Sequence, residues 1–289
     1  MYVNPLPILT FGYSDKQKLQ LNVDKLRHMY KWCSKQTYSN KKSLELINKL
    51  MINIENIYHD YLLEEGDKHK EKYTKFKGWY SASSAGSCHR KQWYKINGYE
   101  ESPYEIRPLR VMRLGTLVHK DLEQAIIGYN NKHKIDDVTV YSEHRIELPN
   151  INVVGHLDLA VDTEDKLFVY DLKTAHSFKW KKVFGRNIDP NPSVNYQLQL
   201  GTYALGLLTE LDKEKSDVEM GLIWYRKDDS MMKIQTIDKE WIQNAFYYWV
   251  ELNESIDEEG KPEIGSYNTP VYNWECKYCN YYKIHCKGK

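Results

Sequence analysis

The stretch GHLDLAVDTEDKLFVYDLK, residues 155–173, decides the fold of this chain. It joins two runs, residues 151–161 and 167–173, that are rich in Val, Leu, Ile and aromatic side chains, as β-strands are. The segment between them, residues 162–166, is polar and short enough to be a turn. The stretch therefore predicts a β-hairpin.

The hairpin loop determines which residues of the two strands face each other. If residues 164 and 165 form a two-residue loop, counting back along both strands places Asp158 opposite Asp171. Directly opposed side chains of an antiparallel pair lie about 4.5–5.5 Å apart at Cβ, a span that suits one hard cation between two carboxylates. Lys173 is two residues beyond Asp171 and therefore points to the same face.

Two carboxylates and a lysine in this arrangement are the groups that cleavage of a phosphodiester requires. Carboxylate-held Mg²⁺ or Mn²⁺ neutralises the phosphate and activates a water, and Asp158 and Asp171 are the expected ligands. The backbone carbonyl of Leu172 is a further candidate oxygen, and His119 a candidate nitrogen ligand that would favour tolerance of Mn²⁺. Lys173 is expected to orient the attacking water or to stabilise the charge that builds in the transition state.

Length and composition bound the class of protein. The chain has 289 residues, 41% of them apolar, which suits one large domain, alone or with an appendage. The formal net charge of +1 excludes a polycation, so any contact with nucleic acid must be a local basic groove or a metal site. The 24 Tyr residues fit either base stacking or ordinary packing at the edge of a core.

The sequence also bounds the compartment. No run approaches the 18 apolar residues of a membrane span, and the first residues lack the pattern of a signal peptide. We therefore expect an intracellular, cytoplasmic protein without a membrane partner. In a reducing compartment its five cysteines are not expected to form disulfides.

Hydrophobic periodicity outlines the remaining elements. Residues 1–78 are rich in lysine, helical in pattern and without a chemical constellation, so we interpret them as a helical extension. The rest of the chain predicts, in order, a helix from near Cys88, a helix at 113–126, the hairpin, a basic loop at 174–194, a helix at 194–208, strands at 219–226 and 232–237, a helix at 239–254 and a loop-like tail from 265. Two pairs, His119 with Glu123 and Gln199 with Tyr203, each share one face of their helix.

The ordered set resembles the RecB-type nucleases of the PD-(D/E)xK superfamily over roughly residues 80–289. The matching pieces are Gly115-Thr116-x-x-His119-x-x-x-Glu123, Gly155-His156-Leu157-Asp158, Asp171-Leu172-Lys173 and Gln199-x-x-x-Tyr203. The resemblance implies an α/β fold with a restriction-endonuclease-like core, in which helices flank a mixed central sheet. It implies a nuclease domain at residues 79–289, preceded by the helical extension at 1–78.

The resemblance also implies roles for the matched residues. The family equivalents of His119, Asp158 and Asp171 hold the metal, and the equivalent of Lys173 is catalytic. Gln199 and Tyr203 correspond to residues of a flanking helix that help to place the lysine and the DNA. Glu123 belongs to the shared pattern without a firm role, and Glu143 is a weaker candidate for the edge of the site.

A cysteine cluster closes the chain. Cys276 and Cys279 form a CxxC pair, and Cys286 follows, which is a spacing typical of metal ligands. A closed tetrahedral site needs a fourth thiolate, from Cys88 or Cys33. Iron–sulfur members of the same family, which include AddB-type subunits and CRISPR-associated exonucleases, pair one upstream cysteine with three C-terminal ones around a [4Fe–4S] cluster. This resemblance favours Cys88 and leaves Cys33 as a buried structural thiol.

Structural Zn²⁺ is the alternative to the iron–sulfur cluster. Four thiolates bind it equally well, and His285 or His89 could replace one cysteine. From the spacing alone the two metals are equally compatible. The nuclease motifs between Cys88 and the tail favour iron–sulfur, and either metal would tie the first helix of the nuclease unit to its tail.

A basic segment after the hairpin is the expected DNA path. Cations and aromatics alternate there, and such a pattern binds the backbone and stacks the bases of a single strand. The alternative is a solvated loop with anchoring aromatics. A second basic group, at Arg107, Arg110 and Arg113, precedes His119. The expected DNA-binding residues are Lys179, Trp180, Lys181, Lys182, Arg186 and Arg113.

Taken together, the motifs and the resemblance predict a metal-dependent DNA nuclease, most simply an exonuclease on single-stranded DNA or DNA ends in recombination, replication or repair. The alternatives are a CRISPR adaptation nuclease that processes prespacers and a non-catalytic DNA-end-binding subunit of a helicase–nuclease complex. No Walker A motif is present, so a helicase or recombination protein would be a separate partner. A single nuclease unit of this size suits a bacterial or phage-encoded enzyme.

Overall fold

The computed structural model describes residues 54–73, 78–102, 106–133, 137–186, 193–214, 217–255 and 260–288. The chain divides into two compact units, Met1–Ile57 and Tyr58–Lys289, and nearly all described residues belong to the second. Most of the predicted helical extension, together with Cys33, lies outside the described residues. The helix Ile54–Tyr73 falls within the extension, and the predicted domain boundary at residue 78 stays a prediction.

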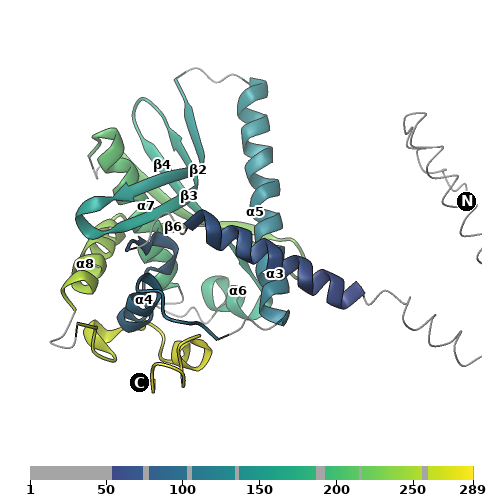
Figure 1. Ribbon diagram of the computed structural model, residues 1–289. Coiled ribbons are helices and arrows are strands. Elements are labelled where there is room, and N and C mark those ends of the chain that lie inside the picture. The colour runs from purple at the N-terminus through teal and green to yellow at the C-terminus, as the bar shows by residue number, and fades with distance from the viewer. Residues whose placement is uncertain are drawn as a thin grey trace, which may run out of the picture. The chain divides into compact units, whose positions relative to one another are not determined.

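The described part of the chain contains both helices and strands (Figure 1). The helices are α3 (Ile54–Tyr73), α4 (His89–Ile96), α5 (Ile106–His133), α6 (Ser177–Phe184), α7 (Val194–Leu211) and α8 (Glu240–Glu254). The strands are β1 (Tyr80–Ser81), β2 (Thr139–Leu148), β3 (Val153–Asp162), β4 (Leu167–Ala175), β5 (Val218–Arg226) and β6 (Met232–Ile237). Short 3₁₀ turns are η2 (Ala82–Ser84), η3 (Pro149–Ile151), η5 (Ser266–Asn268) and η6 (Asn273–Tyr278).

The strands form one mixed sheet in the order β1-β3-β4-β5-β6, and β2 pairs with β3 in addition. β3 is antiparallel to β2 and β4, whereas β4 and β5 are parallel along their whole length. A parallel pair needs a crossover connection, and α6 and α7 supply it between β4 and β5. The predicted fold class, a mixed central sheet flanked by helices, is confirmed.

The predicted register of the β3–β4 hairpin is also confirmed. Thr163 donates its backbone N–H to the Lys166 carbonyl (2.9 Å) across the two-residue loop, and the ladder runs up to the pair Leu159–Tyr170. The next step of this register places Asp158 opposite Asp171, as the sequence predicted. The strands separate at that step, so the site lies where the ladder ends.

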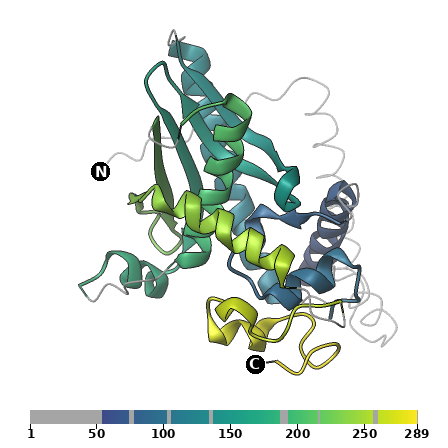
Figure 2. The same ribbon diagram turned by 90° about the vertical axis from the view of Figure 1, so that its left-hand side faces the viewer.

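Helices α5 and α7 cover opposite faces of the sheet, as two neighbouring residues of β4 demonstrate. Lys173 contacts Gln199 of α7, whereas a Cβ added at Gly115 of α5 would lie 3.3 Å from Thr174 Oγ1. Consecutive strand residues point to opposite faces, so the two helices lie on opposite sides. Helix α8 packs outside α7, where Trp249 donates its indole N–H to the Thr202 hydroxyl (2.8 Å) (Figure 2).

Gly155 shows how tightly α7 is seated on the sheet. A Cβ at this position would lie 2.6 Å from the Ala82 Cβ and 3.0 Å from a ring carbon of Tyr203. Real Cβ atoms do not approach backbone-held neighbours this closely, so only glycine lets β3 pass beneath the Tyr203 ring. The glycine of the GHLD motif therefore fixes the spacing between the strand and the helix.

Several elements differ from the sequence predictions: β1 was not predicted, and α5 is longer than the predicted helix at 113–126. The segment predicted as a basic loop contains α6, whose Trp180 and Val183 are buried. The first turn of α6 is held from outside, because Asp228 in the β5–β6 connection accepts hydrogen bonds from the Ser177 amide (2.5 Å) and hydroxyl (2.6 Å). Strand β2 was not predicted, although it pairs with β3 along nearly all its length.

Candidate active site and cysteine pocket

Asp171 is the centre of the candidate active site. Its side chain is fully buried on β4, and Oδ1 accepts a hydrogen bond from Gln199 Nε2 (3.3 Å). Oδ2 lies 2.6 Å from Lys173 Nζ but takes part in no well-aligned hydrogen bond. The ion pair with the ammonium accounts for part of the bonding capacity of this oxygen, and a carboxylate oxygen has a second lone pair that another ligand can use.

Gln199 holds the lysine in place. Its Oε1 accepts a hydrogen bond from Lys173 Nζ (3.0 Å), and its Nε2 donates to the Tyr203 hydroxyl (2.9 Å) as well as to Asp171. The Lys173 ammonium also lies over the ring of Tyr196, 4.8 Å from its centroid, in a cation–π contact. These residues of α7 therefore contact both the lysine and the carboxylate.

His119 reaches the site from the other face of the sheet. Its Nδ1 lies 3.5 Å from Asp158 Oδ2. The same Asp158 oxygen accepts the backbone N–H of Leu172 (2.7 Å). If the β3–β4 ladder continued, this N–H would instead donate to a backbone carbonyl of β3. Because β3 and β4 separate here, groups from α5, β3, β4 and α7 meet at one place.

The charges of the site are strongly coupled. Burial raises the pKa of Asp171 to about 7, against the lowering effect of Lys173. Burial also acts to raise the pKa of Asp158, but the hydrogen bond from His119 and the charge of Lys173 outweigh it and hold that pKa below its usual value. The two carboxylates, in turn, raise the pKa of Lys173 despite burial. The lysine is therefore a fixed positive charge.

Two glutamates lie beside this set. Glu123 and Glu143 line a pocket together with His119 and Asp158, where the sequence had left Glu123 without a role and placed Glu143 at the edge. Glu143 has a left-handed backbone, with φ of 47°. It interrupts the pairing of β2 with β3 opposite Asp158, between the pairs formed by its two neighbours.

The residues present fit a divalent cation. Asp158 and Asp171 offer carboxylate oxygens, the ligands that Mg²⁺ and Mn²⁺ prefer, and Asp171 Oδ2 has no well-aligned hydrogen bond although it is buried. Within the described ranges, no three His, Cys, Asp or Glu side chains converge as a preformed metal site. Binding of a cation would therefore require a small adjustment, since the Lys173 ammonium now lies against Asp171.

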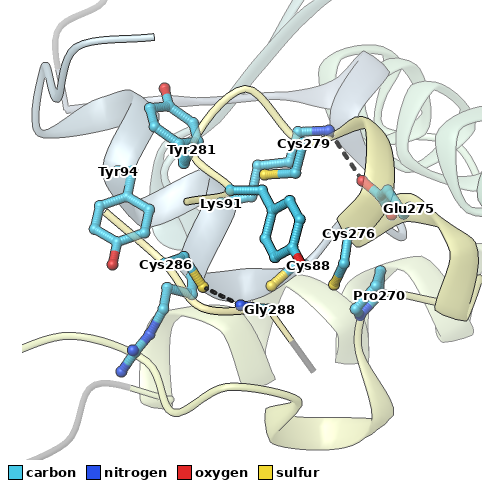
Figure 3. A pocket seen from close by; sticks show the side chains of 12 residues that line it. Cys88, Lys91, Tyr94, Pro270, Glu275, Cys276, Cys279, Tyr281, Cys286 and Gly288 are labelled. Atoms are coloured by element: carbon cyan, nitrogen blue, oxygen red, sulfur yellow. Dashed lines mark hydrogen bonds and ion pairs between the residues drawn. The ribbon is translucent and has the colours of Figure 1, made fainter. Parts of the chain in front are cut away.

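The four cysteines of the predicted cluster line one pocket between α4 and the tail. Cys88 is the residue immediately before α4, and Cys276, Cys279 and Cys286 belong to the tail. Figure 3 shows the sulfur atoms of Cys88, Cys276 and Cys286 around the middle of the pocket, with that of Cys279 set apart from them. All four are free thiols.

Among the described residues these four thiols do not converge as a preformed metal site. Gly288 donates its amide to Cys286 Sγ (3.4 Å). Such bonds to sulfur tune the potential of iron–sulfur clusters. Burial raises the pKa of Cys88 to about 11 and raises that of Cys279, so a bound metal would have to displace thiol protons.

The predicted DNA-binding residues are distributed unevenly. Lys181, Lys182 and Arg186 are exposed, on α6 or just beyond it, and Lys179 is half-buried. Trp180 is only 5% exposed and packs in the core, so its ring is not available to stack on a base.

The second basic group lies on α5. Arg107 is exposed there. Arg113 donates to the Tyr61 hydroxyl (2.9 Å) and lies 3.8 Å from a Glu65 carboxylate oxygen, so this arginine attaches α5 to α3.

Comparison with protein families agrees with this geometry. The model of the PD-(D/E)XK nuclease superfamily matches residues 129–286, more than half of the chain. The match contains Asp158, Asp171, Lys173 and Gln199 and begins after His119. The chain belongs to the PD-(D/E)XK nuclease superfamily. It is therefore a nuclease by family, and its expected substrate is nucleic acid.

Among solved structures, the crystal structure of SSO0001 is 18% identical, with a TM-score of 0.48, and the match covers 80% of this chain and 96% of that one. An alkaline exonuclease from Laribacter hongkongensis, LHK-Exo, is 13% identical, with a TM-score of 0.39, over 64% of this chain and 91% of that one. A second structure of LHK-Exo contains dAMP. No curated protein matches the chain. Among the described residues, no helix is long and apolar enough to cross a membrane.

Proposed function

We propose that the protein is a RecB-type, metal-dependent DNA nuclease that acts as an exonuclease on single-stranded DNA or DNA ends. The observation that carries this proposal is the joined set of Asp158, Asp171, Lys173 and Gln199 at the point where the β3–β4 ladder ends. A non-catalytic DNA-end-binding subunit would not need a lysine, with a side chain only 14% exposed, held against a fully buried carboxylate. The roles of the individual residues below are part of the proposal.

Asp158, Asp171 and His119 would hold Mg²⁺ or Mn²⁺, with the Leu172 carbonyl as a further oxygen ligand. When bound, the cation supplies charge neutralisation at the phosphate and a more acidic water. Lys173 orients the attacking water and stabilises the negative charge on the phosphate oxygens as the phosphodiester bond breaks. Gln199 keeps the lysine at this position, since its amide bonds both the ammonium and Asp171.

The cysteine pocket would hold a [4Fe–4S] cluster through Cys88, Cys276, Cys279 and Cys286. The support is the shared pocket and the Gly288 amide that donates to Cys286 Sγ. Structural Zn²⁺ at the same thiolates remains the alternative. Either metal would fasten the start of α4 to the tail and so close the proposed domain at residues 79–289.

DNA would approach over the exposed cations of α6, Lys181 and Lys182, and of Arg186 beyond it. These side chains lie on the element that directly follows β4 and its catalytic set. Arg113 would contribute less than the sequence suggested, because it already contacts α3. Any helicase or recombination partner would act through this DNA.

The proposal is tested on DNA labelled at one end, single-stranded and double-stranded, with each end blocked in turn, in the presence of Mg²⁺ or Mn²⁺. An exonuclease releases short products from the open end at once, and blocking that end stops the release. Lys173→Ala is expected to slow cleavage at least about a hundredfold. Cleavage of substrates with both ends blocked would contradict the exonuclease mode, and undiminished cleavage by Lys173→Ala would contradict the assigned site.

A further inference from the structure

A row of aromatic rings lies on the cysteine-bearing tail and has no part in the site described so far. Trp274 is 57% exposed and Tyr278 is 76% exposed, in and at the end of η6. Large aromatic rings on a surface are costly to leave in water and mark contact sites when they are grouped. These two rings are grouped, since their centroids lie 6.0 Å apart in an edge-to-face arrangement.

The row is preorganised. Tyr272 stacks on Trp274 with centroids 5.5 Å apart and planes 15° from parallel. The Tyr272 hydroxyl in turn accepts the backbone N–H of Val194 at the start of α7 (3.1 Å). Rings that are fixed before a ligand arrives lose little conformational entropy when it binds.

The row is connected to the candidate active site by cations. Lys173 Nζ lies over the ring of Tyr196 at 4.8 Å. Lys179 Nζ lies over the same ring at 5.4 Å and over the ring of Tyr272 at 5.8 Å. Positive charge and aromatic faces therefore alternate from the proposed catalytic lysine to the tail, which in Figure 1 passes near α6.

The charge of this surface suits a polyanion. Lys277 lies on η6 between the two exposed rings and is itself exposed. The one acidic residue of η6, Glu275, is paired with Lys91 (2.9 Å) in the cysteine pocket. Alternating cations and aromatic faces are how proteins bind single-stranded nucleic acid without sequence preference. In duplex DNA the base faces are already stacked on each other, so they are not offered to a protein surface.

We propose that Tyr272, Trp274 and Tyr278 form a base-stacking platform for single-stranded nucleic acid that leads, through Lys179 and Tyr196, to the candidate active site. This inference rests on the proposed nuclease function, because that function makes the candidate active site the end point of the bound strand. The strand would cross the tail and would not stack on the buried Trp180. The tail would then have a second role besides the proposed metal site, because η6 carries Cys276 as well as Trp274 and Tyr278.

The test is the affinity of the full-length protein for fluorescein-labelled oligo-dT of about 20 nucleotides, longer than the roughly 4–16 nucleotides that one such surface covers. Fluorescence anisotropy is measured without divalent cations, so that binding is separated from cleavage. Trp274→Ala and Tyr278→Ala are each expected to weaken binding about tenfold. Trp274→Phe, which keeps a ring, is expected to stay within about threefold of the wild type.

Tyr247→Ala is the matched control, because Tyr247 is a similarly exposed ring (55%) on another element, α8. It is expected to bind like the wild type, and binding of duplex DNA is expected to be equal in all variants. Unchanged affinity of both Ala variants for oligo-dT would overturn the platform, as would equal losses in Trp274→Phe and Trp274→Ala. Oligo-U in place of oligo-dT distinguishes RNA from DNA.

The two proposals fail separately. If the wild type cleaves DNA but Trp274→Ala binds oligo-dT as well as the wild type does, the nuclease proposal stands and the platform proposal is contradicted. If binding depends on Trp274 but the wild type cleaves no DNA, the platform proposal stands and the nuclease proposal is contradicted.

Discussion

At the scale of single residues, Gln199 shows how one amide can organise a charged site. Its oxygen accepts from Lys173 and its nitrogen donates to Asp171 and Tyr203, so the amide joins a cation, an anion and a phenol. A hydrophobic residue at position 199 would remove one hydrogen-bond acceptor from the Lys173 ammonium. The lysine would keep its charge but would be held less firmly in position.

We expect Gln199→Ala to lower kcat by about 10- to 100-fold, because a small displacement of a catalytic group costs this much. The affinity for oligonucleotide should stay the same, since Gln199 is buried. Single-turnover cleavage together with anisotropy separates the two quantities. Gln243→Ala, an exposed position on α8, is the control and should leave both unchanged. A loss of affinity equal to the loss of rate would contradict a positioning role.

Gly155 leads to a prediction about stability. An added methyl group would collide with Ala82 and the Tyr203 ring, and overpacking of this kind costs about 1–3 kcal/mol. We expect Gly155→Ala to lower the free energy of unfolding by that amount in urea titrations. Gly128→Ala is the control, because nothing lies within 4 Å of a Cβ there and Gly128 is inside a helix. An equal effect of both substitutions would contradict the packing argument.

At the scale of elements, the β3–β4 hairpin could be predicted from sequence because a two-residue loop leaves one register. Helix α6 could not, because its polar face of lysines dominates the pattern and the buried pair Trp180 and Val183 is short. Strand β2 was missed because only its last part is buried, at Ile146 and Leu148. In both cases tertiary contacts decide the structure.

The same limits apply to the candidate site. The hairpin register brought the two carboxylates and the lysine together in advance, and the resemblance to RecB-type nucleases added Gln199. No sequence pattern marks the point where β3 and β4 separate or the left-handed backbone of Glu143. Both features depend on the elements that pack on the two faces of the sheet. The aromatic row on the tail was likewise missed, since Tyr272 and Lys179 are neighbours only in the fold.

The stability of helix α6 against local opening can be tested. Its first turn depends on the hydrogen bonds from Ser177 to Asp228, since carboxylates satisfy the free amides at helix starts. We expect Asp228→Ala to speed hydrogen exchange in α6. Asp165→Ala, in the exposed hairpin loop, is the control. Unchanged exchange in α6 of Asp228→Ala would show that the His176 cap and the buried face of the helix hold it without Asp228.

At the scale of the whole molecule, the cysteine pocket joins the start of α4 to the end of the tail. Residues of both segments also contact each other directly, as when Tyr94 donates its hydroxyl to the His285 carbonyl (2.7 Å). The metal would therefore reinforce an existing contact between distant parts of the chain. A cross-link across so long a stretch restricts the unfolded chain strongly.

We expect anaerobically purified protein to be brown and to contain iron. Cys286→Ser should lose that colour and lower Tm by about 5 °C or more. Elemental analysis and thermal unfolding measure the two effects. Colourless wild-type protein with stoichiometric zinc would contradict an iron–sulfur cluster but would agree with a metal that links the start of α4 to the tail. An unchanged Tm in Cys286→Ser would contradict the closure itself.

The measurement that tests the central claim most directly is the rate of cleavage of end-labelled single-stranded DNA with Mg²⁺ or Mn²⁺ by the wild type, Asp171→Asn and Asp162→Asn. Asp162 is the matched control on β3, paired with Lys213. We expect the wild type and Asp162→Asn to cleave at similar rates only when the cation is added, and Asp171→Asn to be slower by at least about a thousandfold. Cleavage by Asp171→Asn at the wild-type rate would contradict a metal-dependent site built on Asp171.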